Sequence, residues 1–225
     1  MSDMFDKRFY ILAGNYGSGK TELSLNFALT LAKKGNTALC DMDIVNPYFR
    51  SSESAAMLDA HGIRLIKPPF ANTAVDVPAL SAEVFAAFGC AYAVFDAGGD
   101  PVGASALGGL KRYFEDNRAD TVFYYIVNAR RPFQGNVDDA YEMLLQIERN
   151  SRVKVDALVN NTNLAAETTA DDLAYGGEAV SRLSQKTGIP VAFASGTPET
   201  LAGYKALGYG GPTFPIQIFT RPEWL

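Results

Sequence analysis

The sequence predicts a single α/β domain, built as a doubly wound, mainly parallel sheet of about seven strands with helices on both faces. Short, continuous apolar segments alternate with longer segments whose apolar residues recur at helical spacing, and this order is typical of parallel strands joined by helices. The chain has 225 residues, of which 48% are hydrophobic, so one large core is expected. We therefore assign residues 1–225 to one domain.

Each element is predicted from its apolar pattern. The predicted strands are residues 8–13, 37–41, 63–67, 91–95, 121–127, 155–159 and 190–194. The predicted helices are residues 21–34, 52–60, 79–88, 104–117, 137–149, 168–187 and 199–207. Ligands of such sheets bind at the carboxyl ends of the strands, so the polar residues that follow each strand are the candidates for a functional site.

The segment after the first strand reads GNYGSGKT and fits the phosphate-loop pattern G-x-x-x-x-G-K-[ST] at every fixed position. Its glycines allow backbone N–H groups to converge on phosphates, and the following helix adds its positive N-terminal end. Lys20 is expected to neutralise the β- and γ-phosphates, and the Thr21 hydroxyl to bind Mg²⁺. A plain glycine-rich turn, the alternative, needs neither residue. The expected nucleotide contacts are Gly14, Asn15, Tyr16, Gly17, Ser18, Gly19, Lys20, Thr21 and Glu22.

Two carboxylates follow the second strand, Asp41 and Asp43, and residues two apart at a strand exit point the same way. The functional interpretation is that Asp43 positions the attacking water, as a catalytic residue together with Lys20, and that Asp41 supports the metal. The segment 47–50 that follows is not expected to continue a strand or helix. A solvated acidic turn is the alternative.

The fourth strand is followed by Asp96, and a carboxylate in that position is costly to bury without a cation. Mg²⁺ held by Thr21 would be that cation, which makes Asp96 a predicted metal ligand. The next glycines, Gly98 and Gly99, are expected to bring backbone N–H groups to the γ-phosphate. The alternative is an ordinary turn.

The sixth strand leads into Asn160, Asn161, Thr162 and Asn163, which resemble the N-K-x-D base-recognition motif with Asn161 replacing Lys and Asn163 replacing Asp. An amide offers one donor and one acceptor, which suits guanine poorly and favours adenine. Ser195, after the seventh strand, is expected to cover the base with its loop. Ordinary turn chemistry is the alternative for both loops.

Together, GNYGSGKT, DMDIVNP, VFDAGGD and VNNTNL resemble the MinD/ParA/CobQ-type branch of phosphate-loop NTPases over nearly the whole chain. The resemblance implies an ATP/ADP and Mg²⁺ cofactor pair and a slow ATPase that acts as a regulatory or assembly switch on a partner protein. The alternatives are an ATP-dependent enzyme that activates a small molecule, as dethiobiotin-synthetase-like relatives do, a metallochaperone-type GTPase, and a module that holds nucleotide without turnover.

One departure concerns Asn15, where MinD and ParA ATPases carry a signature lysine that reaches the partner's phosphates in a nucleotide-sandwich dimer. Without that charge, any homodimer is expected to form with or without nucleotide. Arg50, Arg130 or Arg131 could replace the lysine in trans, although each is more often a structural arginine.

Composition excludes several classes of function. A net charge of −5 argues against a nucleic-acid or anionic-membrane surface. The two cysteines, Cys40 and Cys90, do not form a C-x-x-C pair, and His61 is the only histidine, so a zinc or iron–sulfur site lacks ligands. No long apolar run or basic anchor occurs, and a cytoplasmic protein is expected.

Overall fold

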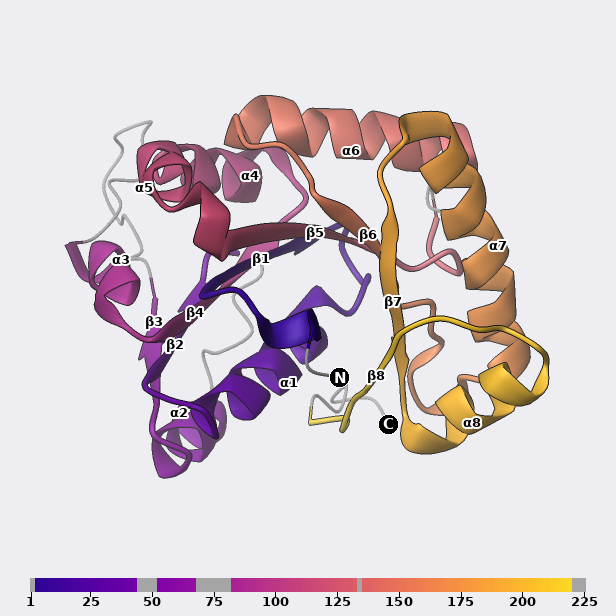
Figure 1. Ribbon diagram of the computed structural model, residues 1–225, viewed down its shortest axis with the longest axis horizontal. Coiled ribbons are helices and arrows are strands. Elements are labelled where there is room, and N and C mark those ends of the chain that lie inside the picture. The colour runs from indigo at the N-terminus through magenta and orange to yellow at the C-terminus, as the bar shows by residue number, and fades with distance from the viewer. Residues whose placement is uncertain (1–2, 44–51, 68–81, 133–134, 220–225) are drawn as a thin grey trace.

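The computed structural model describes residues 3–43, 52–67, 82–132 and 135–219, and these form one eight-stranded, all-parallel sheet (Figure 1). The strand order is β3-β2-β4-β1-β5-β6-β7-β8. The chain starts in the middle of the sheet at β1, moves to one edge through β2 and β3, and then builds the other edge from β5 onward. This confirms the doubly wound α/β prediction.

All seven predicted strands are present, with shifts of a few residues at their ends. The strands are β1 (Phe9–Gly14), β2 (Thr37–Asp41), β3 (Ile63–Ile66), β4 (Tyr92–Gly98), β5 (Thr121–Val127), β6 (Ala157–Asn160), β7 (Val191–Gly196) and β8 (Thr213–Pro215). The prediction of seven strands was short by one, because β8 has only three residues, each of them next to or at a proline, and so carries little strand pattern.

The helices agree with prediction except in the middle of the chain. They are α1 (Lys20–Ala32), α2 (Ser52–Ala60), α3 (Ala82–Ala86), α4 (Pro101–Gly108), α5 (Lys111–Asp116), α6 (Val137–Ser151), α7 (Ala170–Thr187) and α8 (Pro198–Ala206). The single predicted helix 104–117 was wrong: α4 ends at Gly108 and α5 starts at Lys111, since the Gly108-Gly109 pair at the end of α4 disfavours helix. None of the described helices is long and apolar enough to cross a membrane.

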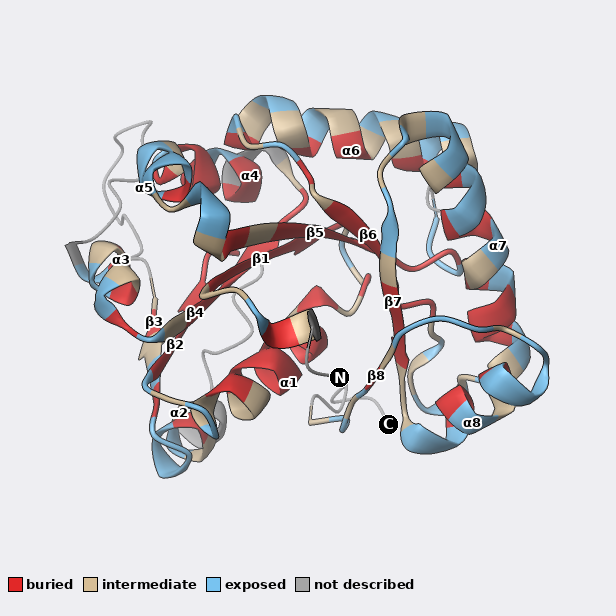
Figure 2. Ribbon diagram, in the orientation of Figure 1, coloured by how far each residue is buried: buried red, intermediate tan, exposed pale blue. Residues whose placement is uncertain are grey.

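Two apolar cores cover the two faces of the sheet. Tyr10 and Leu12 of β1 pack with Phe27 of α1 on one face, whereas Phe9 and Ile11 pack with residues of α3 to α7 on the other. Figure 2 shows the central strands buried along their length. Because both faces are covered, polar groups of the central strands can meet a ligand only at the strand ends.

Candidate functional site

The phosphate loop, residues 14–21, connects β1 to α1 by a tight turn. Gly17 and Gly19 have φ values of 73° and 79°, a left-handed conformation that glycine adopts without strain. The Ser18 N–H donates to the Asn15 carbonyl at 3.0 Å. A Cβ on Gly14 would lie 2.6 Å from the Ile126 carbonyl oxygen, so the start of the loop also has no space for a side chain. The two fixed glycines of the motif, Gly14 and Gly19, and the additional Gly17 thus have steric or conformational reasons.

A buried cluster of one ammonium and three carboxylates lies where the loop enters α1. The Lys20 Nζ is 2.9 Å from Asp43 Oδ2, and only 8% and 7% of the two side chains are exposed. Burial acts to lower the pKa of Lys20, but the carboxylates of Asp96, Asp43 and Asp41 outweigh it and raise that pKa above its usual range. The lysine is therefore charged and held in place beside the loop.

Asp96 lies inside β4 and not after a strand, because β4 extends three residues beyond the predicted end. Across the sheet it is the register neighbour of Asp41 in β2. Both Asp96 carboxylate oxygens are buried and have no hydrogen bond of ordinary geometry among the described residues. Burial raises the pKa of Asp96, while the charge of Lys20 and the Thr21 hydroxyl lower it. A buried carboxylate without ordinary hydrogen bonds is stabilised when a cation binds next to it.

The side-chain oxygens near Asp96 are of the kind that binds Mg²⁺. The ion prefers oxygen ligands and is usually held by one or two carboxylates together with substrate phosphates and water. Thr21, Asp41 and Asp96 could supply the protein oxygens. The Thr21 hydroxyl lowers the pKa of Asp96 and the Asp41 carboxylate raises the pKa of Lys20, so both belong to the surroundings of this cluster. No group of three or more His, Cys, Asp or Glu side chains within the described ranges is arranged to hold a metal by itself.

The predicted glycines after Asp96 pack against the phosphate loop. A Cβ on Gly99 would lie 2.7 Å from the Gly14 carbonyl oxygen and 3.1 Å from the Asn15 amide nitrogen. The Gly103 N–H donates to Asp100 Oδ1 at 3.1 Å, close to the start of α4. Gly99 thus brings the end of β4 into direct contact with the first residues of the loop.

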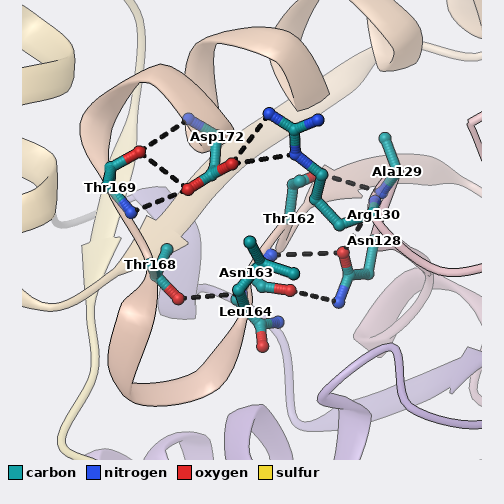
Figure 3. Close-up of polar contacts among 9 residues, drawn as sticks. All are labelled: Asn128, Ala129, Arg130, Thr162, Asn163, Leu164, Thr168, Thr169 and Asp172. Atoms are coloured by element: carbon teal, nitrogen blue, oxygen red, sulfur yellow. Dashed lines mark hydrogen bonds and ion pairs between the residues drawn. The ribbon is translucent and has the colours of Figure 1, made fainter.

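An asparagine that the sequence analysis did not single out, Asn128, connects the phosphate loop to the Asn-rich loop (residues 160–163). Its Nδ2 donates to the Gly17 carbonyl at 3.2 Å and to the Asn163 carbonyl at 3.0 Å. Its Oδ1 accepts from the N–H groups of Arg130 and Asn163 (Figure 3). The sequence feature that would have identified Asn128 is its position directly after the fifth strand.

Asn161 makes a second connection. Its Nδ2 donates to the Ser18 carbonyl at 2.7 Å, and its Oδ1 accepts from the Ser195 hydroxyl at 2.7 Å. The predicted residues Asn161 and Ser195 are therefore brought together with the phosphate loop. Asn160 is buried behind them, and its amide bonds to the Leu173 carbonyl and the Thr162 N–H.

A cavity of about 220 Å³ opens beside these residues. The phosphate loop forms one side, and the loops after β6 and β7 and the residues after β8 form the others. Its lining residues are Gly17, Gly19, Glu22, Arg131, Asn161, Thr162, Asn163, Ala165, Thr168, Ser195, Gly196, Thr197, Thr200, Ile216 and Ile218. The predicted residues Gly17, Gly19, Glu22, Asn161 and Ser195 thus share one cavity, whereas Asn160 does not line it.

The remaining predicted residues lie at the rim or elsewhere. Asn15 uses its Oδ1 to accept from the neighbouring Tyr16 N–H at 2.8 Å, and Tyr16 is 72% exposed. Arg131 donates to the Gly17 carbonyl at 3.1 Å and so lies on the loop of its own chain. Arg130 pairs with Asp172 at 2.8 Å and covers the Tyr175 ring (Figure 3 shows the pair). Arg50 and the segment 47–50 lie outside the described residues.

Comparison with known proteins gives likenesses of structure. No protein-family model matches the chain, and no curated protein matches it either. FtsY from Mycoplasma mycoides superposes with a TM-score of 0.55 at 14% identity, over 87% of this chain and 63% of that one. The cell division protein FtsY from Thermotoga maritima gives 0.53 at 18% identity, over 86% and 63%.

A third solved structure is the signal recognition particle 54 kDa protein from Aeropyrum pernix in complex with GDP, with a TM-score of 0.53 at 17% identity over 88% of this chain and 43% of that one. The three proteins share the fold of this chain. At such low identity the likeness establishes the fold alone, and the chain spans 63% of the length of the two FtsY chains. The resemblance to the MinD/ParA branch stays a prediction.

Proposed function

We propose that this protein is a Mg²⁺-dependent ATP-binding protein and slow ATPase that acts as a switch on a partner protein. The observation that carries the proposal is the buried Lys20, held at the N-terminus of α1 behind a glycine loop that also borders a 220 Å³ cavity. A charged lysine beside converging backbone N–H groups suits phosphates, and a neighbouring cavity suits a base.

The residues of the charged cluster would have different roles in binding and hydrolysis. Incoming phosphates compete with Asp43 for the Lys20 ammonium, now 2.9 Å away, and the displaced carboxylate is then available to orient a water molecule. Thr21, Asp41 and Asp96 would hold Mg²⁺. When bound, that ion supplies charge neutralisation on the phosphate oxygens. A turnover of about 0.01 s⁻¹ is expected, as for phosphate-loop hydrolases that lack an arginine in trans or depend on a slow one in cis.

Adenine is favoured by the amide at Asn163. Its Nδ2 already donates to the Asn161 carbonyl at 2.7 Å and its Oδ1 accepts from the Ala165 N–H at 3.2 Å, so one donor and one acceptor position remain. That pair matches an adenine edge, whereas guanine presents two adjacent donors. Guanine nucleotide is the second candidate, because FtsY from Elizabethkingia anophelis and the Aeropyrum protein were solved with GDP.

Titration of the purified chain with ATP and with GTP, each with and without Mg²⁺, tests the proposal. We expect tighter binding of ATP, dependence on Mg²⁺, and loss of binding in Lys20→Ala. Unchanged ATP affinity in Lys20→Ala would contradict the site. Phosphate release by the protein alone supports the switch, release only with an added metabolite supports a small-molecule-activating enzyme, and retention without release supports a binding module.

A further inference from the structure

The residues after β8, numbers 216–219, form a strap that returns from the β8 edge of the sheet to α1. At its start, the Ile216 N–H donates to the Gly196 carbonyl of β7 at 2.9 Å. Figure 1 shows β8 directed from the α8 end of the molecule toward α1. The strap therefore runs between the loop after β7 and α1, and it borders the cavity.

Two side chains of α1 hold the strap by its backbone. Asn26 pairs with Gln217 in both directions: its Nδ2 donates to the Gln217 carbonyl at 2.9 Å, and its Oδ1 accepts from the Gln217 N–H at 2.8 Å. Glu22, one helical turn earlier, accepts from the Phe219 N–H at 2.7 Å. Both side chains belong to buried residues. They thus satisfy backbone groups that a neighbouring strand would otherwise bind.

The other residues of the strap line the cavity. Ile216 and Ile218 border the same space as Asn161, Asn163 and Ser195. Ile218 is 46% exposed, which is high for a side chain of its size. The cavity is therefore lined by polar side chains and also by two isoleucines from the strap.

We propose that this strap is the apolar wall of the base site, against which the flat face of a purine packs, and that Asn26 is its positioning residue. The inference rests on the proposed nucleotide function and goes further by assigning base affinity to a segment far from the sequence motifs. Glu22 and Asn26 lie on the helix that begins at Lys20, so one helix places both the phosphate-binding lysine and the wall of the base site. A ligand without a base, such as inorganic tripolyphosphate, does not need the strap.

The test compares the dissociation constants of ATP and inorganic tripolyphosphate in the full chain. We expect Asn26→Leu and Ile218→Ala each to weaken ATP about tenfold, equivalent to about 1.4 kcal/mol, and to leave tripolyphosphate unchanged. Thr30→Val is the matched control, because it removes a hydrogen bond from Thr30 to the Asn26 carbonyl on the same helix, and that bond does not involve the strap. It is expected to bind both ligands as the wild type does.

The outcomes separate the two proposals. A wild-type chain that binds neither ligand overturns the nucleotide function and the strap with it. A wild-type chain that binds both, with Ile218→Ala and Asn26→Leu binding ATP normally or losing both ligands equally, overturns the strap alone. Because Asn26→Leu alters a buried site, Ile218→Ala keeps the test valid if the first variant does not fold.

Amide hydrogen exchange gives an independent measurement on the wild type. The N–H groups of Gln217 and Phe219 donate to Asn26 and Glu22, so their exchange reports release of the strap from α1. ATP is expected to slow their exchange, and tripolyphosphate is expected to leave it unchanged. Equal protection by both ligands would contradict the proposal.

Discussion

The two parts of the site, at the head of α1 and at the ends of β6 and β7, are built from opposite kinds of polar group. At α1, the Lys20 ammonium pairs with the Asp43 carboxylate, and neither oxygen of the buried Asp96 has an ordinary hydrogen bond to another described residue. At β6 and β7, the neutral amides of Asn128 and Asn161 bond on both their nitrogen and oxygen sides to backbone or side-chain partners.

The difference separates a prearranged scaffold from the part of the site to which we assign the chemistry. Neutral amides with all partners in place stabilise the loops before any ligand arrives. A buried carboxylate that lacks hydrogen bonds costs stability and is relieved by a cation or a competing ligand. We therefore expect changes in the charged part to alter ligand binding and turnover most, and changes in the amide part to alter stability first.

The largest effect is expected for Lys20→Met. Removing the ammonium leaves three carboxylates buried without their cation, which should destabilise the free protein by about 3–5 kcal/mol at neutral pH. ATP binding should be lost. Denaturant unfolding and ATP titration measure the two effects. Adding Asp43→Asn to Lys20→Met should recover part of the stability, and no recovery would show that the cluster is not coupled.

The next largest effects are expected to differ between Asp43 and Asp96, because the two carboxylates have different proposed roles. Asp43→Asn should lower the rate of ATP hydrolysis at least tenfold without weakening ATP binding, because the proposed contact of Asp43 in the bound state is with water. Asp96→Asn should instead weaken the Mg²⁺-dependent part of both binding and turnover. Measuring both constants at several Mg²⁺ concentrations tests the division, and an equal loss of ATP binding in Asp43→Asn would refute it.

In the amide part, Asn128→Ala should lower the free energy of unfolding by about 2 kcal/mol. Its four hydrogen bonds to Gly17, Arg130 and Asn163 are lost, and several backbone groups remain buried without partners. Thermal unfolding measures this loss of stability. Asn117→Ala is the control, because the Asn117 side chain donates an exposed hydrogen bond to the Tyr113 carbonyl of α5. Similar destabilisation by both variants would contradict the scaffold role.

A smaller, pH-dependent effect is expected at the edge of the amide part. Hydrogen bonds from Thr169 and Arg130 hold the pKa of Asp172 below its usual range. Its contribution to stability is therefore present above the ordinary Asp pKa of about 3.9 and is lost as the pH falls through the lower folded-state value. Asp172→Asn should be about 1 kcal/mol less stable at pH 7, and urea unfolding from pH 7 to 3 should show the difference shrinking.

The smallest effect is expected on oligomeric state. Asn15 contributes no charge, and Arg131 lies on its own loop, so the described residues offer little for ATP to draw a second copy together. Sedimentation without nucleotide, with ADP and with a non-hydrolysable ATP analogue should give one unchanged state. A dimer that appears only with the analogue would show that another residue has taken the lysine's role.

For the fold, local patterns were sufficient where the elements are long and buried. The apolar strand β1, the glycine loop and α1 were all predicted because their periodicities and turn residues agree. β8 and the break between α4 and α5 were not predicted. A three-residue edge strand is defined by its pairing with β7, which has no counterpart in a local pattern.

For the site, the sequence determined the chemistry of individual segments, namely the phosphate loop, the carboxylates after β2 and in β4, and the asparagines after β6. Only the tertiary structure decided which of them share a cavity. It brings Asn161 and Ser195 to the loop, leaves Asn160 behind them, bonds Asn128 to the phosphate loop, and adds Ile218 to the cavity. The reason is that contacts between residues 26 and 217, or 18 and 161, depend on the crossing of strands in space, which no local spacing encodes.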